Sequence, residues 1–367
     1  MMKNLYPELQ TPAPIIDLDI LEKNINRMAG RLQAAGISHR PHIKSHKSAQ
    51  IARMQLDAGA AGITVAKLAE AEVFAAAGVE PILIAYPVIG ADKLERYARL
   101  HLEHKLLTTV DSLTCAAGLS EIGMRTGKPV EVLIEIDGGL HRGGRQAGED
   151  TLHFALELLK LPGIRIAGVM GYFGTIYNNC GAEAFRQAAG EEAVLMRNTA
   201  ELLRSTGVPV DIISTGSSPA ALMSGELEGV TEVRAGNYVF FDASGIGMGL
   251  AGEEECALRV IATVVSTPLP GRATIDAGTK TLTSDKAHGR EGFGIVVGYP
   301  EVTLSALNEE HGFLQYDPEE VSLKIGDRIE IIPNHSCVIP NLHQQVAGVR
   351  GGRRTTWIQI DARGCSY

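Results

Sequence analysis

The chain has 367 residues, 45% of them hydrophobic and 21% charged, so it can bury one or two globular cores and is not disordered. Its net charge is −9, from 34 Lys and Arg against 43 Asp and Glu, and it has no basic run, which argues against a nucleic-acid partner. It has no apolar signal core near its start and no stretch approaching the roughly 18 apolar residues of a membrane span, so we expect a cytoplasmic protein without membrane contact.

From about residue 20 to residue 245, short β-branched or apolar runs alternate with longer stretches of helical periodicity. The short runs are, in chain order, 39–44, 62–65, 82–86, 106–110, 131–137, 166–172, 211–215 and 232–239. Most are separated by Ala-, Leu- and Glu-rich stretches, and the last link, over 219–229, is the shortest helical pattern. Eight such units predict an α/β fold, a (β/α)8 TIM barrel whose strands are covered by helices. A doubly wound open sheet is the structural alternative.

After residue 250 the long helical patterns give way to short Val-, Ile- and Thr-rich segments punctuated by Gly and Pro. Examples are 259–267, 272–278, 327–333 and 355–361. We therefore predict a barrel domain over 15–248 and a mostly β domain over 249–367 that also includes 1–14. The segment TPAPIIDLD (11–19) is expected to join the β domain as an edge strand.

Catalytic residues of a barrel lie where strands end and loops begin. The first run ends in PHIKSHKS, which places Lys44 at the mouth of the barrel, where partial burial would make its amine a nucleophile toward carbonyls. On an extended segment His42, Lys44 and His46 would share one face. Lys47 is the alternative lysine, and an isolated lysine is ordinarily only solvated. A metal cluster of His39, His42 and His46 matches no standard ligand spacing.

The seventh run ends in STGSSPA, which has the composition of an anion-binding turn. Gly216 lets the backbone approach an anion, Ser217 and Ser218 supply hydroxyls, and a proline suits the first position of the following helix. The loops after strands seven and eight of barrels are recurrent phosphate sites, although a simple Gly/Ser turn with a helix cap is the ordinary alternative. Arg142 after strand five and Tyr172 after strand six lie at the same rim.

The β domain contributes PNHSC, in which His335 and Cys337 are two residues apart. On an extended segment both side chains would project from one face, as paired ligands of a zinc-like ion must. The ordinary alternative is a buried cysteine and a hydrogen-bonded histidine that bind no metal. Two protein ligands would leave positions open for water or substrate, as in a catalytic metal site. The chain has five scattered cysteines, and we expect each to be a free thiol or a ligand.

These motifs together resemble the pyridoxal-phosphate enzymes related to alanine racemase, specifically the D-threonine aldolase and D-serine dehydratase branch. The segments that carry the resemblance, in family order, are RPHIKSHKS, ITVAKLAEAEVFAAAGVEPILIAYPVIG, EIDGGLHRGG, TGSSP, EVRAGNYVFFD, DAGTKTLTSD, EEHG and PNHSC. They span nearly the whole chain and are specific when taken jointly.

The resemblance implies a homodimer in which pyridoxal 5'-phosphate forms a Schiff base with Lys44. The phosphate-holding residues implied by it are Thr215, Gly216, Ser217 and Ser218. Arg142, Tyr172 and Tyr238 fall on segments that line the family's cofactor pocket, and Lys44 and Tyr172 are the expected catalytic residues.

His335 and Cys337 match the family's pair of ligands for a divalent metal, which we expect to be zinc or manganese. Dehydratase-like members have His-x-Cys where the aldolases mostly have His-x-Asp, so Cys337 favours elimination. We therefore expect a lyase that dehydrates D-serine or a similar D-β-hydroxy amino acid to a 2-oxo acid and ammonia. Retro-aldol cleavage to glycine and an aldehyde is the alternative. The metal pair argues against a racemase, and residues 250–367 argue against a non-catalytic cofactor carrier.

Overall fold

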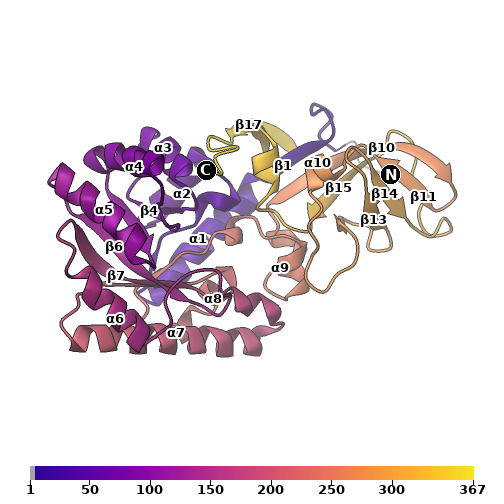
Figure 1. Cartoon of the computed structure of the whole chain (residues 1–367). Helices are drawn as coiled ribbons and strands as arrows, with labels where there is room; N and C mark the ends of the chain where they lie inside the picture. The colour runs from indigo at the N-terminus through magenta and orange to yellow at the C-terminus, as the bar shows by residue number, and fades with distance from the viewer. Residues whose placement is uncertain (1–4) are drawn as a thin grey trace. The chain divides into compact units, whose positions relative to one another are not determined.

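The computed structural model describes residues 5–367, which divide into two compact units (Figure 1). The barrel unit consists of Arg27–Lys44, Ile51–Gly236 and Cys365–Tyr367. The β unit consists of the residues up to Asn26, Ser45–Gln50 and Asn237–Gly364.

Eight parallel strands form the sheet of the barrel unit, in the order β2-β9-β8-β7-β6-β5-β4-β3. Their bounds are β2 Ser38–His39, β3 Ile63–Val65, β4 Ile82–Ile84, β5 Leu106–Val110, β6 Val130–Asp137, β7 Ile164–Tyr172, β8 Ile212–Thr215 and β9 Glu232–Val233. A parallel bridge between His42 and Thr64 joins the two ends of this order, so the sheet closes. The predicted (β/α)8 barrel is confirmed, and the doubly wound open sheet is wrong.

Helices cover the outside of the barrel sheet (Figure 1). Its strands are therefore buried on both faces, as β5 is along its whole length. The helices up to the end of the barrel are α1 Leu18–Ala34, α2 Ala49–Asp57, α3 Leu68–Ala76, α4 Ala91–Glu103, α5 Leu113–Thr126, α6 Glu149–Leu158, α7 Ala182–Ser205 and α8 Ser218–Leu222. Short 3-10 turns are η1 Ile43–Ser45, η2 Gly174–Asn178 and η3 Ser224–Glu226. As the sequence predicted, the link between the last two strands holds the shortest of these helices, α8.

The first and last strands of the barrel are shorter than their sequence runs. After β2 the backbone passes through Pro41, which has no N–H for a ladder, and then turns into η1. Lys44 therefore lies in a 3-10 turn, and the prediction of an extended segment presenting His42, Lys44 and His46 on one face is wrong. The last run likewise ends as a strand at Val233, and η4, Asn237–Val239, follows it.

The β unit contains one nine-stranded sheet, in the order β11-β14-β13-β12-β15-β10-β1-β16-β17. The bounds are β1 Ala13–Asp17, β10 Leu258–Leu269, β11 Arg272–Ile275, β12 Gly294–Val296, β13 Thr303–Leu307, β14 Gly312–Gln315, β15 Arg328–Pro333, β16 Gln345–Arg350 and β17 Arg353–Gln359. An additional pairing of β10 with β11 closes six of these strands into a β-barrel. Short helical segments are α9 Ala243–Gly247, η5 Glu253–Glu255, α10 Thr279–Leu282 and α11 Ile339–Leu342.

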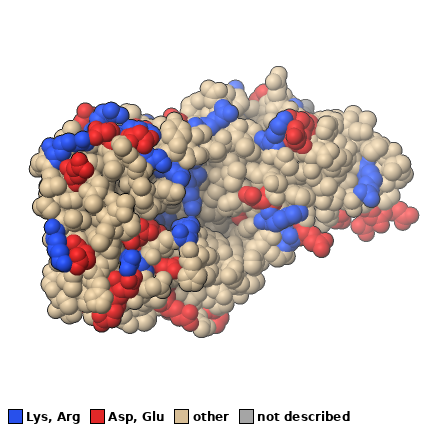
Figure 2. All heavy atoms as spheres, viewed as in Figure 1, with Lys and Arg blue, Asp and Glu red and all other residues tan. Residues whose placement is uncertain are grey.

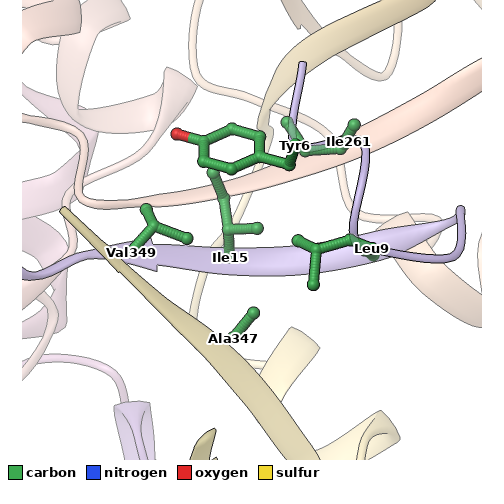
Figure 3. Close-up of a cluster of buried hydrophobic side chains, with 7 residues drawn as sticks. Tyr6, Leu9, Ile15, Ile261, Ala347 and Val349 are labelled. Atoms are coloured by element: carbon green, nitrogen blue, oxygen red, sulfur yellow. The ribbon is translucent and has the colours of Figure 1, made fainter. Parts of the chain in front are cut away.

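Strand β1 lies inside this sheet and not at its edge. It pairs antiparallel with β10 and parallel with β16, which corrects the predicted edge strand. The reason is apolar packing on both sides of β1: Ile15 lies in one buried cluster with Ile261 of β10 and Val349 of β16, to which Tyr6 and Leu9 also belong (Figure 3).

Lys and Arg lie among Asp and Glu on the face drawn in Figure 2. In the barrel unit, for example, Arg96 pairs with Glu72 at 2.6 Å. None of the five cysteines, all of which lie in the described residues, forms a disulfide, as the sequence predicted. Within residues 5–367, no helix combines the length and the apolar character that crossing a membrane requires.

Candidate active site

Two cations predicted at the rim of the barrel, Lys44 and Arg142, lie beside the aromatic ring of a third predicted residue, Tyr172. Lys44 Nζ lies 5.9 Å from the centroid of the Tyr172 ring, and Arg142 Cζ lies 5.0 Å from it. Tyr172 is the last residue of β7, so the strand itself fixes the ring at the carboxyl end of the sheet. The predicted partial burial of Lys44 is wrong, because its side chain is exposed.

The turn that carries Arg142 is organised by a carboxylate. Asp137, at the end of β6, accepts hydrogen bonds at 3.0 Å from the backbone N–H groups of Gly139 and His141, and at 2.6 Å from His141 Nδ1. Burial works to raise the pKa of Asp137, but the hydrogen bonds from His141 and Gly139 hold it below its ordinary value. The charged carboxylate therefore fixes the loop in which Arg142 is the exposed cation.

The β8–α8 turn, residues 215–218, is buried and tightly built. Gly216 has a φ of +92°, and a Cβ there would lie 3.0 Å from Val233 Cβ, so glycine is the residue that fits. Ser217 caps α8 by accepting a hydrogen bond from the N–H of Ala220 at 3.4 Å. Because α8 has five residues, the turn depends on its own hydroxyl and N–H groups more than on a helix dipole.

Glu192, which the sequence interpretation missed, contacts this turn from α7. Its Oε1 accepts hydrogen bonds from the hydroxyl of Thr215 and, at 2.9 Å, from the N–H of Gly216. Burial raises the pKa of Glu192 to about 7, although both hydrogen bonds and the charge of Arg234 act to lower it. Two of the four predicted phosphate residues, Thr215 and Gly216, are thus already bonded to a carboxyl group.

A second missed group is the buried arginine after β9. Arg234 donates to Ser214 Oγ at 2.7 Å and to the carbonyl oxygen of Gly171 at 2.6 Å. Glu232 accepts from Ser214 Oγ and from Arg40 Nε, each at 2.7 Å. Buried charges of both signs therefore alternate behind the rim, where each is paired.

His335 and Cys337 lie in a turn just after β15, so the predicted extended geometry is wrong, yet their side chains do meet through a hydrogen bond. Three neighbours hold the pair. Asp242 Oδ2 lies 3.3 Å from His335 Nδ1. Asn237 Nδ2 donates to Cys337 Sγ at 3.4 Å, and Ser45 Oγ lies 3.2 Å from the same sulfur. This arrangement leaves Nε2 as the imidazole nitrogen free of Asp242.

The charges of His335 and Cys337 shift each other's pKa in opposite directions. Burial works to raise the pKa of the Cys337 thiol, but the His335 charge and hydrogen bonds from His335, Ser45 and Asn237 bring it below its ordinary value. The negative charge of Cys337 in turn raises the pKa of His335. A thiolate and a neutral imidazole are the donors that zinc prefers, so this donor set fits a divalent metal whose binding displaces the proton that the raised pKa places on His335. Among residues 5–367 no group of three His, Cys, Asp or Glu side chains is placed to hold an ion.

The remaining candidate residues named from the sequence lie in other environments. His39 is buried, its Nε2 lies 3.3 Å from the carbonyl oxygen of Ala235, and burial lowers its pKa to about 4, which describes a neutral structural histidine. His46 accepts from the N–H of Ser48 at 3.1 Å, so the three-histidine metal cluster is not formed. Lys47 is buried, unlike Lys44. Tyr238 is buried in η4 of the β unit.

A closed parallel barrel with a rim lysine, followed by a β-barrel unit that carries a His-x-Cys turn, defines an enzyme of the alanine racemase type. Residues 16–244 match the family model described as "Alanine racemase, N-terminal domain", and residues 257–349 match "Putative serine dehydratase domain". The chain belongs to this family of fold-type III pyridoxal-phosphate enzymes, which supports pyridoxal phosphate as its cofactor.

Curated relatives are similar along nearly the whole chain. D-threo-3-hydroxyaspartate dehydratase of a Delftia species is 38% identical, and the match covers 92% of this chain and 93% of that protein. D-threonine aldolase of an Arthrobacter species is 32% identical, over 98% of this chain and 94% of that protein. D-serine dehydratase of Dictyostelium discoideum is 29% identical, over 90% and 91%.

Solved structures are also similar to this chain along nearly its whole length. D-threonine aldolase from Filomicrobium marinum superposes with a TM-score of 0.91 at 30% identity and full coverage of both chains. A structure described as a metal-free form of a cysteine-to-alanine mutant of D-threo-3-hydroxyaspartate dehydratase superposes with a TM-score of 0.90 at 35% identity, covering 97% of this chain and 99% of that one. A histidine-to-alanine mutant of that dehydratase was also solved, and the histidine precedes the cysteine by two positions.

Proposed function

We propose that the chain is a pyridoxal-phosphate- and divalent-metal-dependent lyase that dehydrates D-serine or a similar D-β-hydroxy amino acid to a 2-oxo acid and ammonia. The observation that carries the metal-assisted dehydration is the His335–Cys337 turn. Its ligand spacing equals that of the two residues mutated in the similar dehydratase, whose cysteine mutant is described as metal-free. Lyase activity follows from the dehydratases and aldolases to which the chain is similar.

The barrel rim supplies residues suited to the cofactor. Pyridoxal phosphate supplies an electron sink for the pair of electrons released at the substrate Cα. Lys44 Nζ would hold its aldehyde carbon, and once released that amine is the base that removes the Cα proton. The ring of Tyr172, with Arg142 on it, limits where the cofactor can lie beside Lys44. Ser217 and Ser218 would hold the phosphate, and the absence of a Cβ at Gly216 gives the turn its room.

The β unit supplies the metal ligands. A divalent metal held there would supply Lewis acidity toward the substrate β-hydroxyl, the leaving group of a dehydration. His335 Nε2 and Cys337 Sγ would hold the ion, which we propose to be zinc or manganese. Asp242 keeps the imidazole oriented through Nδ1, and Asn237 and Ser45 direct the sulfur. The homodimer and the cytoplasmic location stay predictions made from the resemblance and the sequence.

Retro-aldol cleavage is the second candidate, and the similarity to two D-threonine aldolases favours it. The same side chains serve either reaction, since the outcome depends on whether the Cα–H bond or the Cα–Cβ bond breaks. The presence of a cysteine at position 337 favours dehydration over aldol cleavage.

The test supplies D-serine, D-threonine and D-threo-3-hydroxyaspartate, with their L-enantiomers as controls, before and after treatment with a chelator. Oxo acid plus ammonia from the D-substrates supports dehydration, and glycine plus an aldehyde supports aldol cleavage. Turnover that is unchanged after the metal has been removed contradicts the metal role. Cys337→Ala should lose both metal and turnover, whereas Cys180→Ala, which removes an exposed thiol, should keep both.

The lysine assignment has its own test. Purified protein should show an absorbance band near the edge of the visible range, and Lys44→Ala should abolish it. Persistence of the band in that variant would move the assignment to Lys47.

A further inference from the structure

Glu192 is a buried carboxyl group that the proposed chemistry does not use. Its side chain lies on the inner face of α7 and is 3% exposed. It accepts two hydrogen bonds from the β8–α8 turn: the hydroxyl of Thr215 and the N–H of Gly216 share one carboxylate oxygen. An acceptor that engages a side-chain and a backbone donor of the same short turn fixes the shape of that turn.

The turn is also where the proposed function puts a phosphate dianion, so Glu192 and the phosphate would be anions on two sides of the same residues. Two neighbouring buried anions repel each other strongly at low dielectric constant. Arg234 is the cation that bears on Glu192 among the described residues, and Glu232 and Glu135 also act on it. Its positive charge is therefore already divided among several carboxyl groups.

We propose that Glu192 is a positioning residue that shapes the β8–α8 turn through Thr215 and Gly216 and takes up a proton from solvent when the phosphate group binds. The inference rests on the proposed function, because it requires a phosphate group at Ser217 and Ser218. Its chemistry is a single protonation, in which a carboxylate plus a proton becomes a neutral carboxyl group.

The direction of the pH dependence follows from linkage. Without the phosphate, burial already places the pKa of Glu192 at about 7. A dianion nearby disfavours the carboxylate further and raises this pKa, so the loaded protein holds more protons than the empty protein above about pH 7. Cofactor affinity should therefore fall as pH rises, by up to about tenfold per pH unit within that window.

The experiment measures the dissociation constant of pyridoxal 5'-phosphate from the cofactor-depleted full chain between pH 6.5 and 8.5, for wild type and for Glu192→Gln. Glutamine keeps an acceptor oxygen for both donors and removes the titration. Ionisation of the phosphate itself affects both proteins, so the ratio of their dissociation constants isolates Glu192. We expect the wild-type affinity to fall up to about tenfold more than the variant affinity per pH unit. Calorimetry in two buffers of different ionisation enthalpy should count correspondingly more protons taken up by the wild type.

Three controls sharpen the result. Glu191→Gln changes the exposed neighbour on the same helix and should behave as wild type. Pyridoxal, which has no phosphate, should bind with the same pH dependence to wild type and to Glu192→Gln. If Glu192→Gln does not fold, Thr215→Val removes one hydrogen bond to the carboxylate, and it should move the fall in affinity to higher pH.

Equal pH slopes and equal proton counts for wild type and Glu192→Gln would overturn the inference and leave the proposed function intact. A lowered melting temperature with unchanged slopes would show a merely structural role, with the same consequence. A wild-type protein that binds no pyridoxal phosphate at any pH would overturn both the proposed function and this inference.

Discussion

Asp242→Asn tests whether His335, a proposed metal ligand, is oriented by a carboxylate. Asp242 Oδ2 lies 3.3 Å from His335 Nδ1 and also accepts hydrogen bonds at 2.9 Å from the N–H of Ser336 and from Asn237 Nδ2. An orienting carboxylate fixes the imidazole tautomer and raises its basicity toward the metal. Asparagine has nearly the same shape and carries no charge, so the change removes this effect with little change in volume.

The size of the effect can be worked from the geometry. Loss of such an outer partner costs about 10-fold to 100-fold in metal affinity. The Nδ1 to Oδ2 distance of 3.3 Å is slightly longer than an ordinary N–H···O hydrogen bond, so we expect the lower end, about tenfold or about 1.4 kcal/mol. Both carboxylate oxygens accept hydrogen bonds, Oδ1 from the N–H of Gly245 and Oδ2 from the N–H of Ser336. In either orientation of the asparagine amide, its NH2 group therefore faces an N–H group from which it cannot accept. The variant should also lose about 1–3 kcal/mol of stability.

The assay titrates the metal-depleted protein with zinc against a chromophoric chelator, at a temperature where urea unfolding shows the variant to be folded. Cobalt binding then reports thiolate ligation through its charge-transfer band. Asp276→Asn is the matched control, because Asp276 also accepts with both oxygens, from Thr263 N–H at 2.8 Å and the Thr11 hydroxyl at 2.6 Å. It should lower stability and leave the zinc affinity unchanged. A folded Asp242→Asn protein with wild-type zinc affinity would refute the reasoning.

Three further predictions concern the barrel unit. Gly216→Ala combines a φ of +92° with a Cβ contact of 3.0 Å, so urea unfolding should show a loss of about 1–3 kcal/mol, whereas at Gly225 a Cβ meets nothing within 4 Å and alanine should be tolerated. Burial lowers the pKa of His39 to about 4, so on acidification the unfolded chain protonates this histidine at a higher pH than the folded chain does. The free energy of unfolding should therefore fall by up to about 3 kcal/mol between pH 6.5 and 4, and His39→Gln should flatten that profile. Tyr172→Ala removes the ring between two cations and should weaken retention of pyridoxal phosphate in equilibrium dialysis by about threefold to tenfold, while Tyr172→Phe, which keeps the ring, should not.

Most of the barrel could be predicted from the sequence because the pattern that indicates each strand is local. Each strand is a short apolar run between helical patterns, and the number and order of runs suffice to predict the fold. What failed were the ends of the first and last runs, where Pro41 interrupts the ladder and 3-10 turns replace strand. The interior position of β1 also depended on distant partners, since β10 and β16 follow it by more than 200 residues.

For the candidate site, spacing predicted which residues come together better than it predicted their local backbone geometry. Lys44, Tyr172 and Arg142 do come together, because the carboxyl ends of parallel strands meet at one rim. Glu192 was missed although a signal existed. Helical periodicity places it on the apolar face of α7 with Ala189 and Met196, where a glutamate needs a partner.

Asp242 shows where a single sequence stops being informative. An aspartate before ASGIG has the pattern of a helix cap, and Oδ1 indeed accepts from the N–H of Gly245 at 3.0 Å at the start of α9. The cap needs only one of the two oxygens. The other holds the turn of His335 and Cys337 through the N–H of Ser336, and no local pattern relates two segments 94 residues apart. Because one carboxylate serves both segments, any change that loosens the cap must also loosen the turn that would hold the metal, so stability and metal affinity are coupled through this residue.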